Sequence, residues 1–534
     1  MATHTQKLQD GLYELTESTR AELVDSKYYN KDLAPTSMAE RTWNTYHISM
    51  LWVGMSICIP SFTMASGLVG MGLPVWAAVF NVILGNVLIL IPIQLNSHAG
   101  TRYGIPFPGF ARMAFGIRGA HLPSLSRAIV ACGWCAVQSA LGGAAVLYIV
   151  QATGWQPGPN DIVAGNAGSS PVGWIAFLVF LAMTWALTSF GSKVIRLFES
   201  IGSPILIIMS VALFVWAVTL AGNAGYGIGD VFGHNISAAA GEDFNFTMVF
   251  LGGLTGNIGF WATMALNIPD FSRFAKNQKA QFRGQLYGMP LTMAACAIVG
   301  AVFAQATSLA NLDGQNTPLF SPVETLSFID SKALLVILGI GVIIATLTTN
   351  IAANVVAPGN GFSNVAPRKI SFFWGVTIAC LIAIGYNFLL VGASAGNLFN
   401  FLNVYGGILA PLAAIFIVDY WLIKKQRLDV KALYQGSEGR YWYQNGFNVT
   451  ALIAWIAGAI LPTLYSIIQI ATTNPDTGAS ENAFVTNPVL GFINTNSYIW
   501  AFIVAFVVYW LIGPSQKQAI LTEEEESALT EVVA

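Results

Sequence analysis

The chain has 534 residues, of which 55% are hydrophobic and only 9% are charged, and its formal net charge is −2. Soluble domains carry about 25% charged residues, so the composition excludes an ordinary soluble protein, and the small net charge gives no basis for nucleic-acid binding. Apolar runs of about 20 residues, long enough to cross a bilayer as helices, recur along the chain. We expect an all-α integral membrane protein with about twelve spans, near 48–71, 74–97, 121–152, 172–190, 199–222, 246–268, 286–308, 333–356, 371–392, 397–423, 447–472 and 498–513.

Basic residues alternate between the two ends of these spans. Lys and Arg precede the first span and follow each even-numbered one, and Lys332 is the exception at the edge of the eighth span. Three connections on the other side carry no basic residue: 156–172, 222–243 and 473–497. Because cytoplasmic loops are enriched in Lys and Arg, the tails 1–47 and 514–534 are predicted to be cytoplasmic. We expect a multi-pass protein of the cell membrane.

Pro60 lies inside the first span. Proline cannot donate a backbone hydrogen bond and its ring clashes with the preceding turn, so an unbroken helix through residues 56–62 is disfavoured. We therefore expect the first span to be interrupted.

The third span carries Trp134 and Gln138, which are four residues apart and share one face of a helix. Tryptophans usually lie at membrane interfaces, so a mid-span Trp beside a Gln is unusual. An indole that stacks on a flat ring contributes about 0.5–1.5 kcal/mol, and a carboxamide matches the donors and acceptors on the edge of a nucleobase or hydantoin. Helix packing is the alternative role for both residues.

The sixth span contains a glycine-rich run at 252–259 that ends at Phe260 and Trp261. Glycines lower the cost of unwinding, so a second interrupted helix is expected here. Spans 1 and 6 are equivalent if 48–222 and 246–423 are two repeats, with 447–513 as two additional helices. Breaks at matching positions of two halves are typical of secondary transporters with a midplane binding site. Trp261 would supply a second indole to enclose a flat ring.

The eighth span contains a polar run in its middle, with Thr348, Thr349, Asn350 and Asn354. Polar groups are expensive at membrane depth unless they have partners. Hydroxyl oxygens suit a small hard cation such as Na⁺, and the two amides, four residues apart on one helix face, suit a polar heterocycle. The alternative is that these side chains only hold helices together in lipid.

Several longer motifs occur in a fixed order at 39–41, 103–108, 115–120, 261–271, 349–354 and 419–420. In these motifs the chain resembles the nucleobase:cation symporter-1 family, from Arg41 to about Tyr434. The resemblance implies a LeuT-like fold with two inverted five-helix repeats plus two additional helices.

The resemblance also implies which residues form the binding sites. It places substrate contacts at Trp134, Gln138, Trp261, Asn350 and Asn354. It places a sodium site at backbone oxygens of Gly54, Ile57 and Ala345 and at the hydroxyls of Thr348 and Thr349. Two residues depart from the family's hydantoin transporter, which has a glutamine at the position of Cys58 and a glycine at that of Phe260. We expect Cys58 and Phe260 to line the pocket and to tune its specificity.

These features predict a symporter, not an enzyme, that imports a planar nucleobase-like heterocycle, uracil or a related nucleobase, together with Na⁺. Its partners are expected to be the small-molecule substrate and the lipid bilayer, with the monomer as the functional unit. Allantoin or hydantoin is the alternative substrate, and H⁺ is the alternative coupling ion. Proton coupling usually needs a titratable group at membrane depth, whereas Glu199, Asp270 and Asp419 are expected near span ends, so the paired threonines favour Na⁺. The glycine-bearing segment 403–407 is a candidate outer gate.

Overall fold

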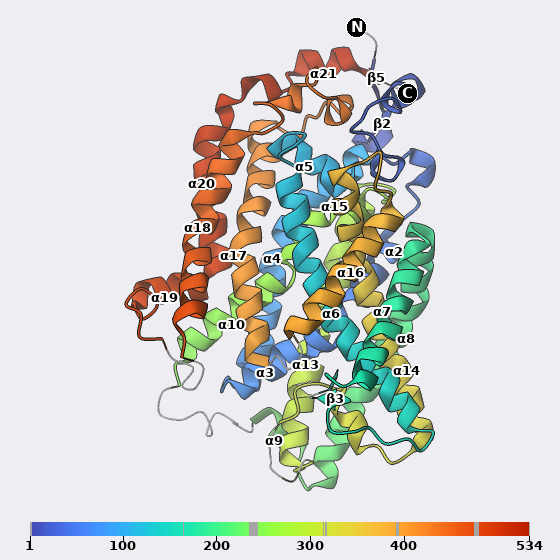
Figure 1. Ribbon diagram of the computed structural model, residues 1–534, viewed down its shortest axis with the longest axis vertical. Helices are drawn as coiled ribbons and strands as arrows, with labels where there is room; N and C mark the ends of the chain where they lie inside the picture. The colour runs from blue at the N-terminus through green and yellow to red at the C-terminus, as the bar shows by residue number, and fades with distance from the viewer. Residues whose placement is uncertain are drawn as a thin grey trace.

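The computed structural model describes residues 3–163, 165–233, 244–312, 314, 318–390, 395–474 and 480–532. They form an elongated bundle in which long helices run roughly along one axis (Figure 1). Ten helices within the described ranges are long and apolar enough to cross a membrane. They are α4 (Val75–Tyr103), α6 (His121–Gln151), α7 (Pro171–Ser189), α8 (Ser192–Asn223), α10 (Phe246–Phe260) with α11 (Ala262–Asn267), α13 (Gln278–Leu309), α14 (Lys332–Thr349) with η6 (Asn350–Val355) and α15 (Val356–Val365), α17 (Ala395–Ile417) with η7 (Val418–Ile423), α18 (Val449–Thr472) and α20 (Ser497–Ile512).

Two further spans complete the bundle. The bent pair α2 (Thr45–Ser56) and α3 (Ile59–Gly70) passes the same test as one broken span. Helix α16 (Phe372–Leu390) is shorter but equally apolar. Counted over the described residues, ten helices, the bent pair and the shorter α16 are consistent with the about twelve spans expected, and a mostly helical membrane fold is confirmed.

Burial separates central from peripheral helices. The apolar window of α6 is 78% buried, as are those of α10–α11 and α17, whereas that of α8 is only 17% buried. A helix that exposes apolar side chains along most of its length faces lipid, because lipid is the solvent that accepts them. Helices α6, α10 and α17 therefore form the centre of the bundle, and α8, α18 and α20 lie at its outside (Figure 1).

Both predicted interruptions exist: the first lies within the predicted range 56–62, and the second lies at the end of the glycine-rich run and not inside it. The first break is at Ile57 and Cys58, whose backbones are not helical, and α2 and α3 meet at a bend of 54°. Pro60 lies in the first turn of α3, where its missing N–H is tolerated, so it starts the second half-helix. The second break is at Trp261 (φ −101°, ψ 7°). The glycines before it stay inside α10, and Gly253 gives room for the side chain of Leu68.

The two tails fold together at one end of the bundle, where both termini lie (Figure 1). Strand β1 (Thr5–Lys7) pairs antiparallel with β2 (Tyr13–Leu15) and parallel with β5 (Thr530–Val532). Arg41 fastens this sheet to the bundle, because its guanidinium donates to the carbonyls of Tyr13 (2.8 Å) and Thr101 (3.1 Å). Short elements complete this end: α1 (Glu17–Leu23), α5 (Phe107–Phe115), α12 (Pro269–Ser272), α21 (Glu523–Leu529) and the 3-10 turns η1 (Gln9–Gly11), η2 (Lys31–Leu33), η3 (Met38–Glu40), η8 (Lys431–Tyr434), η9 (Arg440–Trp442), η10 (Gly513–Ser515) and η11 (Lys517–Ala519).

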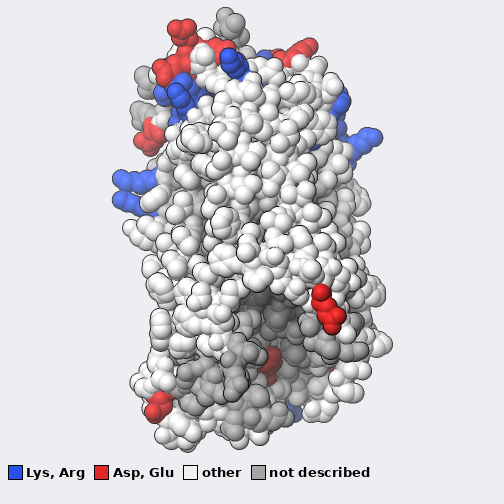
Figure 2. Space-filling model, turned by 90° about the vertical axis from the view of Figure 1, so that its left-hand side faces the viewer, with Lys and Arg blue, Asp and Glu red and all other residues white. Residues whose placement is uncertain are grey.

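The opposite end carries short connecting elements: the hairpin β3 (Ile162–Val163) and β4 (Asn166–Ala167), α9 (Ile228–Gly233), η5 (Glu324–Phe328) and α19 (Pro488–Thr495). Figure 2 shows that Lys and Arg gather toward the end where the termini lie, and that charged residues are nearly absent from the middle of the visible face. This charge-poor middle is what a lipid-facing surface requires.

Candidate substrate and cation sites

The structure brings the twelve residues predicted for the two sites into the interior of the bundle. They lie on α2, the α2–α3 break, α6, the α10–α11 break, α14 and η6. All are buried, and the most exposed is Phe260 at 8%. Residues that are far apart in the sequence therefore meet in one enclosed region next to both breaks.

Two threonines of α14 cluster with backbone carbonyls of α2. Thr348 Oγ1 donates to the carbonyl oxygens of Gly54 (3.0 Å) and Ala345 (2.9 Å). Thr349 Oγ1 lies 3.2 Å from the carbonyl oxygens of Gly54 and Met55 and 3.1 Å from that of Ala345. Hydroxyl and carbonyl oxygens gathered in this way fit a small hard cation. The Met55 carbonyl thus joins the cluster, and the role of the Ile57 carbonyl as a cation ligand stays a prediction.

The break in the first span explains why these carbonyls are available. In a continuous helix the Gly54 carbonyl would accept from the N–H of Cys58, four residues on. Here the Cys58 N–H donates to the Ser56 carbonyl instead, at 3.0 Å. The last carbonyls of α2 therefore need partners from outside their helix, and the threonines of α14 supply them.

Four aromatic rings form a row beside this cluster. The rings of Trp134 and Phe260 meet edge to face with centroids 5.4 Å apart, and Phe260 meets Trp261 in the same manner at 4.9 Å. Trp52 of α2 contacts the other side of Trp261, at 5.1 Å. Phe260 thus lies between the two tryptophans that the sequence suggested as a sandwich. A flat ligand that stacks between Trp134 and Trp261 must displace the Phe260 ring.

Tyr405 of α17 ties this row together. The Trp134 indole N–H donates to the Tyr405 hydroxyl at 3.2 Å, and that hydroxyl donates to the Gly259 carbonyl at 2.9 Å. One side chain therefore links α17 to α6 and to the end of α10. The segment 403–407 that contains it lies inside α17, and its gating role stays a prediction.

The two amides of the eighth span contact each other. The Asn354 side-chain NH₂ donates to Asn350 Oδ1 at 3.1 Å, and the Asn350 NH₂ points to Ser139 (3.2 Å) and Thr184 (3.4 Å). Both lie in η6, a π-helical turn, which the sequence did not indicate and which is frequent at functional sites. Asn350 therefore orients Asn354, and Asn354 is the amide better placed to meet a ligand.

Gln138 and Cys58 connect the cation cluster with the ring row. The Cys58 thiol interacts with the side chains of Thr349 and Gln138 and lies 3.2 Å from the Ser61 hydroxyl. Gln138 is 1% exposed, and its Oε1 has no hydrogen-bond partner among the described residues. An unsatisfied buried carbonyl costs about 1–3 kcal/mol, which a ligand donor would recover.

An arginine near the start of α6 links this helix to two neighbouring elements. Arg127 donates to the Thr263 carbonyl (3.1 Å), to Asn267 Oδ1 (2.9 Å) and to the Ala353 carbonyl (2.5 Å). Next to it, Asp270 of α12 accepts from the Phe107 N–H at 3.0 Å, and burial raises the pKa of this carboxyl to about 6. The Arg127 contacts join α6 to α11 and η6, and the Asp270 contact joins α12 to α5, so these elements are fixed together beside the site.

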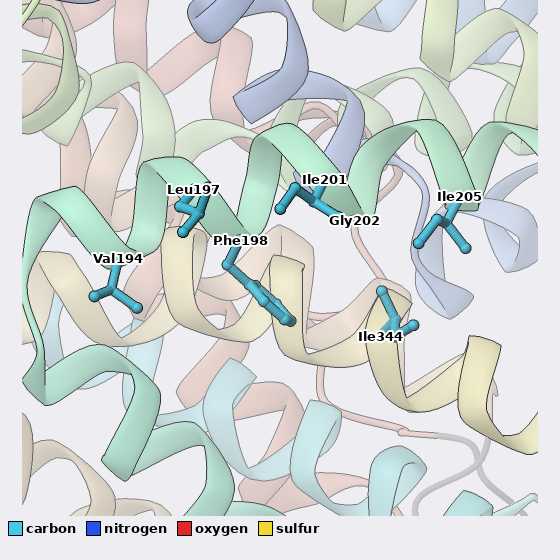
Figure 3. Close-up of a pocket in the computed structure, with 7 residues that line it drawn as sticks. All are labelled: Val194, Leu197, Phe198, Ile201, Gly202, Ile205 and Ile344. Atoms are coloured by element: carbon cyan, nitrogen blue, oxygen red, sulfur yellow. The ribbon is translucent and has the colours of Figure 1, made fainter.

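A groove on the outside of the bundle is a poor alternative site. It measures about 260 Å³ and runs between α8 and α14, where Figure 3 shows the side chains that line it. Its lining residues are all apolar or glycine: Val194, Leu197, Phe198, Ile201, Gly202, Ile205 and Ile344. Side chains without donors or acceptors cannot recognise the polar edge of a heterocycle.

Sequence reasoning missed the Met55 carbonyl, Trp52, Tyr405, Arg127 and the burial of Glu199, which is 2% exposed. Tyr405 could have been predicted as a site residue, because it lies inside the segment 403–407, which its glycines marked as a candidate gate. Arg127 carried a signal as well, since a charged residue inside a span is rare. Which carbonyl of α2 meets a threonine depends on the backbone path at the break, which no local pattern encodes.

Comparison with known proteins agrees with this architecture. Residues 35–486 match the family described as permeases for cytosine/purines, uracil, thiamine and allantoin. The chain belongs to this family. It is 35% identical to the purine-uracil permease NCS1 of Arabidopsis thaliana, over 95% of this chain and 81% of that protein. It is 33% identical to the allantoin permease of Bacillus subtilis, over 83% and 89% of the two chains.

Among solved structures, the chain is similar to Mhp1, a nucleobase-cation-symport-1 family transporter solved in a closed conformation with bromovinylhydantoin bound. The TM-score is 0.71 at 23% identity, over 94% of this chain and 99% of Mhp1. This similarity confirms the fold expected from the sequence. The protein is thus a multi-pass membrane transporter of the permease family, and not an enzyme.

Proposed function

We propose that this permease imports a planar nucleobase-like heterocycle, uracil or a related nucleobase, in symport with Na⁺ by alternating access. The observation that carries the proposal is the cluster of Thr348 and Thr349 hydroxyls on the α2 carbonyls at the break. Its neighbour Cys58 interacts with Thr349 and with Gln138, and Gln138 lies one turn after Trp134 on α6, so the cation cluster adjoins the ring row. An ion bound at the threonine cluster would therefore fix the position of the side chains that line the neighbouring heterocycle site.

In this mechanism, Na⁺ binds to the oxygens of Gly54, Ala345, Thr348 and Thr349 and holds α2 against α14. The backbone conformation at the α2–α3 break decides whether the carbonyl of Ile57 or that of Met55 also binds the ion. The heterocycle stacks against Trp134 and Trp261, and its polar edge meets Gln138 and Asn354. One inward charge at about 100 mV contributes about 2.3 kcal/mol, which supports a concentration ratio of about fifty.

Phe260 and Cys58 are proposed to select among heterocycles. Phe260 fills the slot between the tryptophans, so its size limits the ring that enters, and Cys58 shapes the wall beside Gln138. Allantoin or hydantoin is the second candidate substrate, because the allantoin permease of Bacillus subtilis is nearly as similar as the purine-uracil permease. Proton coupling remains the alternative to Na⁺.

The proposed orientation places both termini in the cytoplasm of a cell whose plasma or inner membrane holds the protein. It is supported by the Lys and Arg side chains at the end where the termini lie. The monomer is proposed as the functional unit, since both proposed sites are built from one chain.

The deciding experiment is uptake of radiolabelled uracil by cells that express the protein, with Na⁺ or with choline in its place. Unlabelled uracil, cytosine, adenine, guanine, hydantoin and allantoin serve as competitors. We expect saturable uptake that one nucleobase blocks and that disappears without Na⁺. Uptake that ignores Na⁺ but falls with a protonophore would transfer coupling to H⁺, and the absence of uptake or competition by any of the six would overturn the substrate class.

A further inference from the structure

Glu199 lies where an acidic side chain is least expected. It is the eighth residue of α8, inside a predicted membrane span, and it is 2% exposed. Neither carboxylate oxygen has a hydrogen-bond partner among the described residues. The sequence placed Glu199 near the end of its span, but α8 begins earlier, at Ser192, and buries the carboxyl group against α2.

The carboxyl group rests directly on Gly54. A methyl group in place of the Gly54 hydrogen would overlap Glu199 Oε2 and would lie 2.8 Å from Ser203 Oγ. Glycine is thus required here, and it lets the carboxyl group approach the backbone whose carbonyl receives both threonine hydroxyls. Ser203, one turn after Glu199 on the same face, donates to the Met50 carbonyl at 2.7 Å and does not bond to the carboxylate.

Helix α8 is held in this position by two further contacts. A Cβ atom on Gly202 would lie 3.2 Å from the Thr348 methyl group. Helix α8 therefore packs closely on α14 at the cation cluster, as it does on α2. Pro204 has no N–H for the Ser200 carbonyl, and the Tyr46 hydroxyl donates to that carbonyl at 3.2 Å. The position of Glu199 against the cluster is therefore built into the packing of three helices.

The charged and titratable neighbours on the packed helices are engaged elsewhere or point outward. Arg196 donates to Thr42 at 2.7 Å, and His47 caps α2 at Asn44. Cys296 of α13 lies 3.5 Å from the Ser56 carbonyl. Three others on α13 are exposed, Lys279, Arg283 and Tyr287. Helix α7 carries no titratable residue, and Lys332 lies at the far end of α14.

A buried carboxylate without a partner and a cation held only by neutral oxygens are both costly in a low-dielectric interior. When the carboxylate and the cation lie next to each other, their attraction offsets the desolvation cost of both. We propose that Glu199 is the charged ligand of the coupling cation, so that the cation site is formed by α2, α8 and α14. This inference rests on the sodium coupling proposed above and adds to it a ligand from a third helix, whose charge raises the affinity of the site.

The test measures Na⁺ binding by thermal unfolding of the purified full-length protein, in NaCl against choline chloride at mildly alkaline pH. The variants are Glu199→Gln, Glu199→Asp and Thr349→Ala, with Glu324→Gln as a matched control outside the site. Glu199→Gln is expected to raise the half-saturating Na⁺ concentration at least about tenfold, because the site loses its ligand charge. In choline chloride the same variant is expected to melt at or above the wild-type temperature, because it removes an unpaired buried charge.

Glu199→Asp keeps the negative charge but, because its side chain is shorter, moves the carboxylate away from the cation cluster. We expect its Na⁺ affinity to lie between those of the wild type and Glu199→Gln. At saturating Na⁺ its melting temperature should rise as much as that of the wild type. This variant decides the question if Glu199→Gln cannot be purified. Wild-type Na⁺ affinity in Glu199→Gln or Glu199→Asp, with the response lost in Thr349→Ala, would overturn the role of Glu199 and leave sodium coupling intact. A wild-type protein that Na⁺ does not stabilise would overturn both.

Discussion

The two interrupted spans break in different ways. Between α2 and α3, two consecutive residues leave the helical conformation and the axis bends by 54°. Between α10 and α11, only Trp261 departs, its N–H still reaches the Ile258 carbonyl at 3.3 Å, and one span continues from Phe246 to Asn267. The first break therefore exposes backbone oxygens, whereas the second mainly turns a side chain.

This difference corresponds to two kinds of ligand. Carbonyl oxygens freed by a sharp break need hydroxyls or a cation as partners, and here the α14 threonines occupy them. A mild break keeps nearly all helix hydrogen bonds and uses its irregularity to aim the Phe260 and Trp261 rings across the bundle. We infer that the first break serves the ion and the second serves the heterocycle, and substitutions at each should fail in separable ways.

The largest effect is expected at the aromatic break. Trp261→Ala removes a buried ring that contacts both Phe260 and Trp52, and the stacking of one base on an aromatic side chain contributes about 1–3 kcal/mol by alanine substitution. Because the loss of the ring also releases Phe260, uptake of the substrate should fall by about 100-fold while the protein remains in the membrane. Trp510→Ala, on α20 with 55% of the residue exposed, is the matched control. Normal uptake by Trp261→Ala would remove Trp261 from the site.

The next effect is expected at the amide pair. Asn354→Ala removes the carboxamide that Asn350 orients, and a ligand edge left without its partner loses about 1–3 kcal/mol. The KM for the heterocycle should rise about 5- to 150-fold, with the Na⁺ dependence unchanged. Asn86→Ala provides the control, because the Asn86 amide donates to the Val82 carbonyl of its own helix. An equal loss in both variants would mean that Asn354 only packs.

A smaller and different effect is expected at the backbone break. Thr349→Ala removes a hydroxyl that lies near the carbonyls of Gly54, Met55 and Ala345. The half-saturating Na⁺ concentration for uptake should rise about tenfold, equivalent to about 1.4 kcal/mol, while the order of competing heterocycles stays the same. Thr346→Ala is the control, since its hydroxyl donates to Val342 in its own helix at 2.6 Å. A change in competitor order with unchanged Na⁺ dependence would contradict the separation of the two breaks.

Much of the architecture could be predicted, because a run of about 20 apolar residues is enough to identify a membrane helix. The apolar runs gave the twelve spans, and Thr348, Thr349 and Trp134 stood out because polar or aromatic residues at membrane depth need a reason. The interruption of the first span was predicted from Pro60, although proline only begins α3. The break itself lies three residues earlier, at Ile57, which has no sequence signal of its own.

The unpredicted features all depend on contacts between distant segments. Phe260 meets Trp134 because α6 lies next to the α10–α11 break, and the contact of Thr349 with the Met55 carbonyl follows from how α14 meets α2. Glu199 appeared to lie at a span end because Lys193 and Arg196 precede it, whereas α8 begins at Ser192 and buries Glu199 against Gly54. Tertiary packing, which composition does not encode, decided each of these cases.

The smallest effect is expected at the hydroxyl that joins the two sides of the ring row. Tyr405→Phe keeps the ring and loses the bonds to Trp134 and to the Gly259 carbonyl, each worth about 0.5–1.5 kcal/mol. The KM for the heterocycle should rise about threefold to tenfold with no change in Na⁺ dependence, because the hydroxyl orients Trp134 but does not reach the threonine cluster. Tyr465→Phe, which loses a comparable bond to the Val485 carbonyl away from the site, should leave KM unaltered. If Tyr405→Phe instead weakened Na⁺ binding, the two breaks would be coupled through α17, and the division between an ion break and a heterocycle break would fail.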